Sequence, residues 1–526
     1  VAGFERAMAE QRERSRAGGA GAEEDRLALD AEAIAKLKYQ GVKPTDDSHK
    51  FHARNVRAVV KAIWNGRNFD ETTGGTRRAT EKVGIVLDRT NFYAEMGGQV
   101  SDHGRMQVSR ERRSSVNDSS HGGEFRVDEV RSFGGYVLHV GHVTRGELRV
   151  GDDVELNLEN QRRARIAANH TATHLVNFAL RRVLGEGVDQ KGSLVAEDRL
   201  RFDLSHNAPI QPAELEQAER IVREVIAADE PVCADLAPLE TARSIAGLRA
   251  VFGEQYPDPV RVVSVGRKVE DLLADPANAG NAGRSIEFCG GTHAHSTGEI
   301  RAFAFTREEG VAKGVRRIEA VTGVAAEAAE SAADALEQRI ADAERLPADR
   351  LAQEMAEISG ELDSLTLPLV RKHRLRERLA GMLDRVKQLQ KERAKQAAQE
   401  AAGMARRIAE SAAASMDEIT IAELPVGGDR QALQAGMKTI TDKVPRNAVM
   451  LFSPDEAEGK VAILAVCPKH AIERGLKAGD WVREVAEMLG GKGGGRPEQA
   501  QGGGTDLSRL RDAIQHARRF ANQKLH

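Results

Sequence analysis

The chain has 526 residues, of which 40% are hydrophobic, 30% are charged and 4% are aromatic, and its formal net charge is −3. This length accommodates about three or four domains, and the slightly acidic balance excludes a protein that binds nucleic acid through a general excess of basic residues. No stretch approaches the roughly 20 consecutive apolar residues of a membrane helix, and no secretory signal peptide is recognisable, so we expect no membrane partner.

The first 160 residues fall into two parts of different composition. Residues 1 to about 36 are rich in Ala, Glu and Arg and predict helix broken at Gly18-Gly19, within a helical linker segment of residues 1–52. Residues 53–160 contain short β-branched runs separated by Gly and Asp, which predicts a small β-barrel with a polar surface loop at 109–121. The clearest strand candidates are 83–87, 135–140 and 154–158.

Residues 161–324 mix helical and strand patterns and predict an α+β domain. A helical pattern starts near Ile166, and a second helix, with Pro212 near its start, extends to Ala228. The remaining patterns are strand-like runs at 200–204, 260–265, 300–305 and 315–320, and a loop insertion at 274–284.

Residues 325–412 show the apolar spacing of packed helices. Two runs in which apolar residues recur every three or four positions flank Pro368, which should interrupt the helix. The simplest solution is an antiparallel helical hairpin in which each apolar seam covers the other. The seams are Leu351, Met355, Ile358, Leu362 and Leu365 in the first run, and Leu375, Leu379, Met382, Val386 and Leu389 in the second.

The last segment, residues 413–526, predicts a separate small α/β domain, in which a Gly-rich loop from Gly490 to Gly504 separates two helices. The strand candidates are 448–452 and 461–466, and the helix candidates are 481–489 and 507–525. The whole chain is therefore expected to be a multidomain α+β protein.

The cysteine content indicates the redox environment. Cys233, Cys289 and Cys467 are an odd and sparse set that does not form a disulfide framework, so we expect a reducing compartment, the cytoplasm or alternatively the mitochondrion. The chain begins with Val1 in a charged helical stretch and has no initiator methionine. We therefore expect a fragment or a processed product.

Two residue pairs carry the strongest chemical signal. His170 and His174, in His-Thr-Ala-Thr-His, are spaced i, i+4 in a helical stretch, so both imidazoles project from one face. Cys289 and His293, in Cys-Gly-Gly-Thr-His, lie in a Gly-rich turn in which the backbone can bend to bring a thiolate and an imidazole together. Three nitrogens and one sulfur match the ligand preference of Zn²⁺, so we expect one zinc ion.

The spacing leaves the role of this zinc open. Four protein ligands can close a structural site, whereas three ligands and a water form a catalytic one. The two pairs lie far apart in the chain, unlike the ligands of a zinc finger, which lie within roughly 30 residues of one another. Active-site metals are often held in this way. His206 and His295 are further imidazoles, which we interpret as surface histidines.

Three segments offer polar groups near these ligands. A hydroxyl at Thr173 would stand beside the metal, or alternatively bond its own helix backbone. Gln190 begins a polar Gln-Lys-Gly-Ser turn, which is otherwise an ordinary connection from helix to strand. Asn91 to Gln99 sets aromatic residues against a double glycine, which favours a close approach to a ligand or to another domain, with a hairpin turn as the alternative.

Local basic patches are the candidates for nucleic-acid contact in a chain of this charge. Arg162 and Arg163 lie in one patch, which is alternatively a solvated helix face. Lys492 and Arg496 lie in the Gly-rich loop, whose amides and cations can approach phosphates. The loop is not a Walker loop, because no Ser or Thr follows Lys492, and a flexible loop is the alternative.

Together these motifs resemble the C-terminal half of the alanyl-tRNA synthetase family, from about residue 1 to the end. Stand-alone alanyl-tRNA editing proteins and the second domain of threonyl-tRNA synthetase share the His and Cys spacing, but the hairpin and the Gly-rich tail favour the alanyl enzyme. The insertion at 274–284 and Pro44–Ser48 are similar to eukaryotic-type members. The resemblance is carried by Asn91–Gln99 with Asp102, Asn169–His174, Gln190–Ser193, Ser285–His293, Arg316–Gly323 and Gly490–Gly504.

The resemblance implies a zinc site that hydrolyses tRNA(Ala) mischarged with Ser or Gly. Thr173 and Gln190 fall at positions associated with editing, so Thr173 is implied to recognise the seryl hydroxyl or to position the attacking water, and Gln190 to shape the pocket. The C-terminal domain is implied to bind tRNA, and the C-terminal region to support a homodimer. The implied metal ligands are His170, His174, Cys289 and His293.

The family's aminoacylation core, with its ATP and Mg²⁺ site, has no recognised counterpart here, nor has the region that reads the tRNA acceptor stem. We therefore expect the chain to deacylate tRNA without charging it. Whether the metal activates water or only anchors the substrate stays open. Two further readings remain, a non-catalytic zinc-stabilised module for tRNA binding or assembly, and a general metallohydrolase with no RNA partner.

Overall fold

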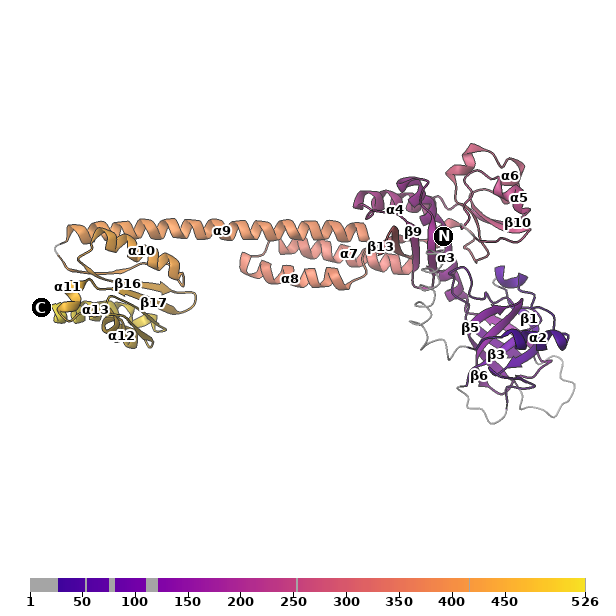
Figure 1. The fold of residues 1–526 in the computed structure, drawn as a ribbon, viewed down its shortest axis with the longest axis horizontal. Helices are drawn as coiled ribbons and strands as arrows, with labels where there is room; N and C mark the ends of the chain where they lie inside the picture. The colour runs from indigo at the N-terminus through magenta and orange to yellow at the C-terminus, as the bar shows by residue number, and fades with distance from the viewer. Residues whose placement is uncertain are drawn as a thin grey trace, which may run out of the picture. The chain divides into compact units, whose positions relative to one another are not determined.

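The computed structural model describes residues 27–52, 54–74, 81–109, 122–251, 254–415 and 417–525, and it divides into two compact units, residues 1–379 and 380–526 (Figure 1). The predicted N-terminal helix before Leu27, with its break at Gly18-Gly19, lies outside the described residues, and so does the predicted polar loop after Ser109. Among the helices that are described, none combines the length with the apolar content that a membrane crossing requires.

The described N-terminal segment is a short helix that packs on a barrel. Helix α2 (Ala31–Tyr39) begins after Asp30, whose carboxylate accepts a hydrogen bond from the N–H of Ala33 and so caps the helix. Its buried face, which includes Leu37, contacts the barrel strands around Trp64. Part of the segment that the sequence predicted as a linker is therefore packed against the domain that follows it.

A closed β-barrel follows, which confirms the predicted barrel. In the described residues, six antiparallel strands close in the order β1-β3-β6-β5-β4-β7, because β7 pairs back onto β1, and the short β2 extends β1 at one edge. Apolar side chains fill its interior. The elements are η1 (Ser48–Phe51), β1 (Val56–Trp64), β2 (Phe69–Asp70), β3 (Val83–Leu87), β4 (Gly104–Val108), β5 (Glu124–Phe133), β6 (Tyr136–Arg145) and β7 (Asp153–Leu158).

The next domain is a four-stranded antiparallel sheet, in the order β13-β14-β9-β8, packed against helices α3 and α4. Helix α3 begins at Asn160, before the start that the pattern predicted, and all its residues from Ile166 to Leu180 are buried. The helix therefore runs through the core of the domain. The elements are α3 (Asn160–Leu184), β8 (Gln190–Val195), β9 (Leu200–Ser205), α4 (Pro212–Ala227), β13 (Phe303–Ala312) and β14 (Val315–Thr322).

A smaller three-stranded antiparallel sheet, in the order β10-β11-β12, leads into the Cys289 turn. The insertion predicted as a loop at 274–284 is partly helical, because a 3₁₀ turn begins at Asn278, whose side chain accepts a hydrogen bond from the N–H of Gly280. The elements are β10 (Val232–Ala237), α5 (Leu239–Arg243), β11 (Val260–Val265), α6 (Val269–Ala274), η3 (Ala279–Gly283), β12 (Ile286–Phe288) and η4 (Thr297–Ile300).

Three helices follow where the sequence predicted a hairpin of two. The predicted break at Pro368 is confirmed, but a second break lies at Pro347, because proline removes a backbone donor and disfavours helix in the residue before it. The apolar pattern missed the first helix because its buried face is mostly alanine. The helices are α7 (Gly323–Ala343), α8 (Ala348–Ser364) and α9 (Leu369–Ala414). The predicted seam residues found buried are Met355, Ile358, Leu362, Leu375, Leu379 and Val386, whereas Leu365 is exposed.

The second unit contains a five-stranded mixed sheet with helices on both faces. The strand order is β15-β16-β17-β19-β18, and only β15 and β16 are parallel. Helices α12 and α13 cover one face around the buried Trp481, and α10 covers the other around Leu433. The elements are β15 (Ile419–Glu423), α10 (Arg430–Lys443), β16 (Ala448–Asp455), β17 (Lys460–Val466), α11 (Lys469–Glu473), α12 (Ala478–Met488), β18 (Lys492–Gly495), β19 (Gln499–Gly504), η5 (Leu507–Arg509) and α13 (Leu510–Leu525).

The Gly-rich segment is a β-hairpin, so the prediction of a loop from Gly490 to Gly504 is wrong. Strands β18 and β19 pair at the edge of the sheet. A Cβ at Gly493 or Gly502 would lie 2.6 or 2.7 Å from Cγ1 of Val482 on α12. These glycines let α12 approach the sheet closely. The pattern favoured a loop because glycine runs lack the β-branched residues typical of strands.

Candidate metal centre

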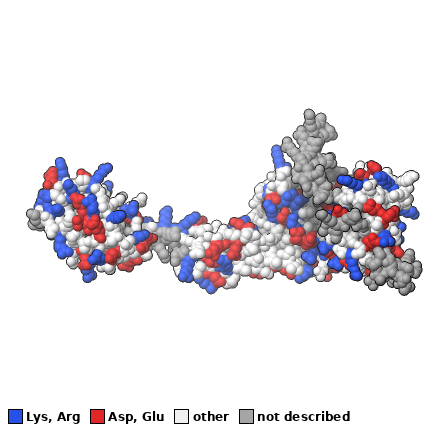
Figure 2. All heavy atoms as spheres, turned by 90° about the horizontal axis from the view of Figure 1, so that it is seen from below, with Lys and Arg blue, Asp and Glu red and all other residues white. Residues whose placement is uncertain are grey.

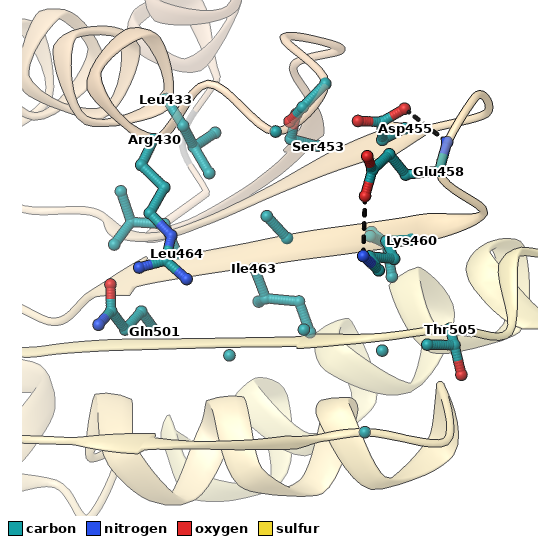
Figure 3. A pocket seen from close by; sticks show the side chains of 18 of the residues that line it. Arg430, Leu433, Ser453, Asp455, Glu458, Lys460, Ile463, Leu464, Gln501 and Thr505 are labelled. Carbon is teal, nitrogen blue, oxygen red and sulfur yellow. Dashed lines mark hydrogen bonds and ion pairs between the residues drawn. The ribbon is translucent and has the colours of Figure 1, made fainter. Parts of the chain in front are cut away.

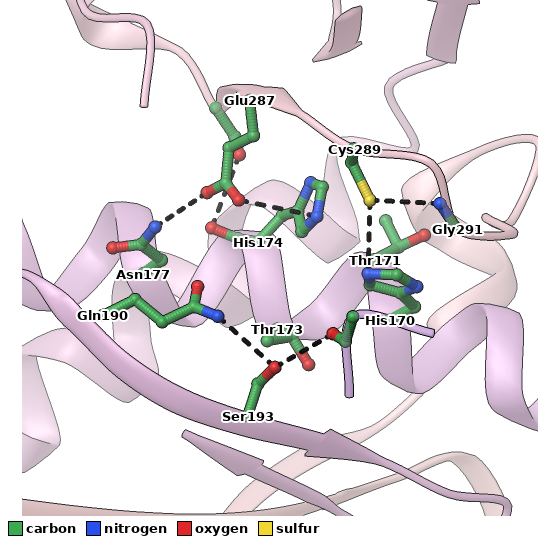
Figure 4. A network of polar contacts seen from close by, with 12 residues as sticks. His170, Thr171, Thr173, His174, Asn177, Gln190, Ser193, Glu287, Cys289 and Gly291 are labelled. Carbon is green, nitrogen blue, oxygen red and sulfur yellow. Dashed lines mark hydrogen bonds and ion pairs between the residues drawn. The ribbon is translucent and has the colours of Figure 1, made fainter. Parts of the chain in front are cut away.

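The four predicted ligands come together in one group, and Figure 4 shows three of them, His170, His174 and Cys289. His170 and His174 project from helix α3, and Cys289 and His293 belong to the turn that follows strand β12. One donor atom of each residue lies within 4.8 Å of those of the other three. His295 is exposed, and neither it nor His206 belongs to this group.

Two distances in this group match the spacing of ligands around a tetrahedral metal. The sulfur of Cys289 lies 3.4 Å from Nε2 of His170 and 3.4 Å from Nε2 of His293. Ligands at the usual Zn–N and Zn–S bond lengths stand about 3.3–3.8 Å apart in a tetrahedron. Three imidazoles and one thiolate are a donor set that suits Zn²⁺.

Burial controls the protonation of the ligands. Removal from water lowers the pKa of His170 to about 3, with the charge of Arg261 adding to the effect, and it lowers the pKa of His174 and His293 well below the usual value. All three rings are thus neutral, as metal ligands must be. Burial also raises the pKa of the Cys289 thiol to about 12, so the thiolate needs a positive charge beside it, which a divalent cation supplies.

Arg261 and Gly291 shape the turn that carries the sulfur. The Arg261 guanidinium donates hydrogen bonds to the carbonyls of Cys289 and Gly291, each over 2.9 Å. A Cβ on Gly291 would overlap the ring of His170, so the turn approaches helix α3 this closely only with glycine at this position. The Gly-rich turn therefore needs glycine at position 291, because the ring of His170 occupies the space that a Cβ would take.

Glu287 lies beside His174 and is held by Asn177, and the sequence reasoning missed both residues. Nε2 of His174 lies 3.5 Å from a carboxylate oxygen of Glu287, whose other oxygen accepts a hydrogen bond from the Asn177 amide over 2.9 Å. Burial raises the pKa of Glu287 to about 7, while Arg249 and Asn177 oppose the rise. Spacing held a signal for both residues, since Asn177 lies three positions after His174 on a helix and Glu287 two before Cys289 on a strand.

A cavity of about 600 Å³ opens beside the four-residue group. Thr173 and Gln190 both line it together with Ser193, and Figure 4 shows the three side chains below the ligands. The Thr173 hydroxyl donates to the carbonyl of Asn169 over 2.8 Å, and the Gln190 amide donates to the Ser193 hydroxyl over 3.3 Å. The helix-backbone alternative for Thr173 is therefore realised, and the residue also lines the cavity.

The other predicted contact residues lie elsewhere. Arg163 is buried, and its guanidinium donates to the Asp102 carboxylate and to two backbone carbonyls. Arg162 is half-buried and pairs with Glu197. These contacts hold α3 against neighbouring segments, and the prediction that the two arginines bind tRNA stays a prediction.

A second cavity, of about 800 Å³, lies in the C-terminal unit over strands β17 and β19 (Figure 3). Its lining carries charges of both signs, including an ion pair between Lys460 and Glu458. Arg430, also in the lining, lies near the uncharged Gln501. The predicted phosphate-binding residues Lys492 and Arg496 are exposed but do not line it. Figure 2 likewise shows basic and acidic side chains interspersed over one face of the molecule.

Four family models match parts of the chain. The model described as tRNA synthetases class II (A) matches residues 1–162, and the Threonyl and Alanyl tRNA synthetase second additional domain matches 260–319. The Alanine--tRNA ligase domain matches 326–392, and the DHHA1 domain matches 417–523.

Curated relatives match over nearly the whole chain. Alanine--tRNA ligase, cytoplasmic, of Dictyostelium discoideum is 41% identical over 504 residues, which are 94% of this chain and 51% of the relative. The cytoplasmic enzyme of Drosophila melanogaster is 37% identical over 523 residues, covering 95% of this chain and 52% of the relative. The mitochondrial enzyme of Saccharomyces cerevisiae is 35% identical over 525 residues, covering 99% and 52%.

This chain belongs to the alanyl-tRNA synthetase family. The resemblance that the motifs predicted is thereby confirmed. The chain spans about half the length of the curated relatives it matches. The model of the second additional domain includes Cys289 and His293, whereas His170 and His174 lie before its match.

Proposed function

We propose that this chain hydrolyses tRNA(Ala) mischarged with Ser or Gly, at a site where His170, His174, Cys289 and His293 hold one Zn²⁺. The observation that carries the proposal is the cavity of about 600 Å³ whose wall joins three of these ligands to Thr173 and Gln190. In this proposal ATP- and Mg²⁺-dependent charging is done by another part of the enzyme. The relatives named as alanine--tRNA ligases support tRNA(Ala) as the RNA.

An alanine-specific enzyme needs such a site for a physical reason. Serine and glycine differ from alanine by one small group, and a binding pocket discriminates so small a difference only about 10- to 200-fold. A second site that hydrolyses the wrong ester corrects the error. Water attacks the carbonyl carbon, the bond from that carbon to the ribose oxygen breaks, the ribose oxygen takes a proton, and the free amino acid leaves. When bound, zinc supplies positive charge that polarises the ester carbonyl or lowers the pKa of a water.

Thr173 is the residue we assign to recognition of serine. Its hydroxyl hydrogen is used in the bond to the carbonyl of Asn169, so toward the cavity the oxygen offers lone pairs only. A seryl hydroxyl can donate to these lone pairs, and an alanyl methyl group cannot. Gln190, whose amide donates to the Ser193 hydroxyl, lines the same cavity, and we assign it to shaping the pocket.

Deacylation of defined substrates tests this proposal. The zinc-loaded chain is expected to release serine from Ser-tRNA(Ala) faster than alanine from Ala-tRNA(Ala), and Cys289→Ala should abolish the difference. Thr173→Val should slow Ser-tRNA(Ala) hydrolysis more than Gly-tRNA(Ala) hydrolysis. Cys233→Ala, at a half-buried cysteine of strand β10 outside the ligand group, serves as the matched control. Equal slow rates on both substrates that do not respond to Cys289→Ala would exclude an editing site.

A second candidate function is a zinc-stabilised module that binds tRNA without catalysis. The observation that favours it is that four protein donors gather in one group, which is the full set of a closed structural site. Removal of zinc by a chelator distinguishes the two candidate functions. A structural zinc should unfold the domain of α3 when removed, whereas a zinc that serves the substrate should leave the fold largely intact and stop deacylation.

The remaining parts of the proposal concern partners and location. We assign tRNA contact to the exposed Lys492 and Arg496, a homodimer to the C-terminal region, and the cytoplasm as the compartment, with the mitochondrion as the alternative. Relatives carry both location labels. Light scattering of the purified chain at several concentrations tests the dimer.

A further inference from the structure

Gln99 reaches the metal centre from outside the domain that carries the ligands. It is the last residue of the barrel segment Asn91–Gln99, and its side chain is fully buried. Its carboxamide oxygen lies 2.6 Å from Nδ1 of His170 and accepts the backbone N–H of Thr292 over 3.0 Å, while its amide nitrogen donates to the Thr292 hydroxyl over 2.9 Å. One side chain thus touches a ligand ring and the turn between Cys289 and His293.

These hydrogen bonds identify the carboxamide oxygen of Gln99 and the protonated ring nitrogen of His170. A backbone N–H can only donate, so the Gln99 atom facing the N–H of Thr292 is the oxygen. The same oxygen then requires a proton on Nδ1 of His170, which leaves the lone pair of the neutral ring on Nε2. Nε2 is the atom that faces the Cys289 sulfur at 3.4 Å. The hydrogen bond therefore presents the coordinating nitrogen to the ligand group.

A parallel arrangement holds His293. The Thr171 hydroxyl donates to the carbonyl of Ala167, so it accepts from Nδ1 of His293, and Nε2 of His293 faces the Cys289 sulfur. Thr171 belongs to the same helix as His170, whereas Gln99 comes from the barrel segment. The metal centre is therefore built by two domains in the described structure.

The barrel segment is locked in place by backbone contacts. The N–H of Val195 donates to the carbonyl of Gly98, and the N–H of Val100 donates to the carbonyl of Val195, so the segment runs beside strand β8. A Cβ on Gly98 would lie 2.5 Å from the carbonyl oxygen of Ser193. The buried pair of Asp102 and Arg163 ties the same segment to α3. These contacts fix the position of Gln99 beside His170.

We propose that Gln99 is a positioning residue of the metal centre, through which docking of the barrel holds His170 and the Cys289 turn in the metal-binding arrangement. The inference rests on the proposed metal centre. Partners that orient metal-ligating histidines typically account for about 10- to 100-fold in metal affinity. Such an effect is measurable without any assay of catalysis.

The main test measures zinc affinity of the full chain by competition with a chromogenic chelator. Gln99→Met keeps the side-chain length but removes all three hydrogen bonds of the carboxamide, and we expect zinc binding about 10- to 100-fold weaker. Gln99→Glu keeps the acceptor for His170 and Thr292, and we expect affinity within a few-fold of wild type. Gln107→Met, at an exposed glutamine of β4, is the matched control and should change nothing. Wild-type affinity in Gln99→Met overturns the proposal.

A glycine pair tests the docking of the segment. Gly97 and Gly98 both have positive φ, so alanine strains the backbone at either position, but only at Gly98 does its Cβ meet a neighbour. We expect Gly98→Ala to weaken zinc binding several-fold more than Gly97→Ala. Equal effects of the two changes would contradict a role for docking.

A measurement on the wild-type chain covers the case that variants fail to fold. In zinc-loaded protein with ¹⁵N-labelled histidine, the His170 ring should carry its proton on Nδ1, with His170→Ala providing the assignment. A proton on Nε2 of His170 overturns the proposal. Wild-type chain that binds no zinc contradicts the metal centre itself, whereas zinc binding that depends on Gln99 without deacylation contradicts only the proposed activity.

Discussion

Two glycine-rich segments look alike in the sequence and have different neighbours in the structure. In the turn after β12, a Cβ on Gly291 would overlap the ring of His170, a candidate metal ligand. In the β18–β19 hairpin, a Cβ on Gly493 or Gly502 would press on Val482, an apolar residue of helix α12. The first segment had suggested a turn that brings two metal ligands together, and the second a loop whose amides and cations approach phosphates. The atom nearest to the missing Cβ belongs to a candidate metal ligand in the first segment and to an apolar side chain in the second.

The difference shows what a glycine run reveals. It marks a place where the backbone comes close to something, since a missing Cβ removes the main steric barrier to close approach. The neighbour decides whether the approach serves chemistry or packing. A ring with a coordinating nitrogen makes the turn part of a metal centre, whereas a valine makes the hairpin part of a core.

The largest expected effect comes from removing the sulfur that the first segment carries. Cys289→Ala deletes one of four ligands, which account together for roughly 10–16 kcal/mol of binding free energy in zinc peptides. We expect zinc affinity to fall about 100-fold or more, on the order of 3 kcal/mol. Metal content after dialysis, measured by elemental analysis, checks this. Cys467→Ala, at a buried cysteine of the C-terminal unit, should keep the zinc. Full zinc retention in Cys289→Ala would show that Cys289 is not a zinc ligand, and the turn after β12 would then not belong to a metal centre.

Within the turn, the two neighbouring glycines should behave differently. Gly291→Ala places a Cβ in the His170 ring, whereas at Gly290 the nearest atom is the flexible end of Met96, 3.5 Å away. We expect Gly291→Ala to weaken zinc binding about 10- to 100-fold through a displaced ligand and Gly290→Ala to leave it nearly unchanged. Chelator competition gives both numbers. If the two variants bind zinc alike, the close approach at Gly291 has no bearing on the metal.

In the hairpin, the same kind of change should alter stability and leave zinc alone. A Cβ at Gly502 would stand 2.7 Å from Val482 and 2.9 Å from the Cα of Gly493, while at Gly494 nothing lies within 4 Å. We expect Gly502→Ala to lower the free energy of unfolding of this unit by roughly 1–3 kcal/mol, the usual cost of overpacking. Gly494→Ala is the matched control.

Fluorescence of Trp481 reports this unfolding in a Trp64→Phe background, because the chain has only these two tryptophans. Trp481 is buried against α13 and donates to the carbonyl of Ala517. A Gly502→Ala unit as stable as that of Gly494→Ala would show that α12 does not need the close approach. Loss of zinc in Gly502→Ala would contradict the prediction that the hairpin affects stability and not zinc binding.

Much of the site was predictable because its signals are local. The i, i+4 spacing of His170 and His174 requires only a helix, and helical periodicity is visible in the sequence. The donor types of Cys289 and His293 linked these residues to that pair, and the family resemblance implied the same four ligands. Gln99 lay inside a segment that the sequence marked as a close approach, but its partner was hidden, because pairing of distant segments depends on the fold of two domains.

The features that the sequence did not reveal share one physical cause. Each depends on which residues pack against it in the folded chain. The alanine face of α7 gave no apolar signal, because small side chains pack closely without standing out in a hydrophobic pattern. The buried contact of Arg163 with Asp102 was also hidden from the sequence, because the two residues lie 61 positions apart. Glycines 493 and 502 took their meaning from Val482 on another element.

The smallest expected effect concerns the outer surface of the hairpin. Lys492 is exposed on β18, so the proposed contact with tRNA rests on a charge at the surface and needs no close backbone approach. If Lys492 contacts one phosphate, Lys492→Ala should weaken tRNA(Ala) binding about three-fold and reduce the slope of log affinity against log salt concentration by roughly 0.9. Lys38→Ala, at an exposed lysine of α2, is the control. A titration at several salt concentrations distinguishes the outcomes: an unchanged slope would mean that the hairpin serves packing alone, and a reduced slope would give the second glycine-rich segment a contact with RNA that its glycines do not make.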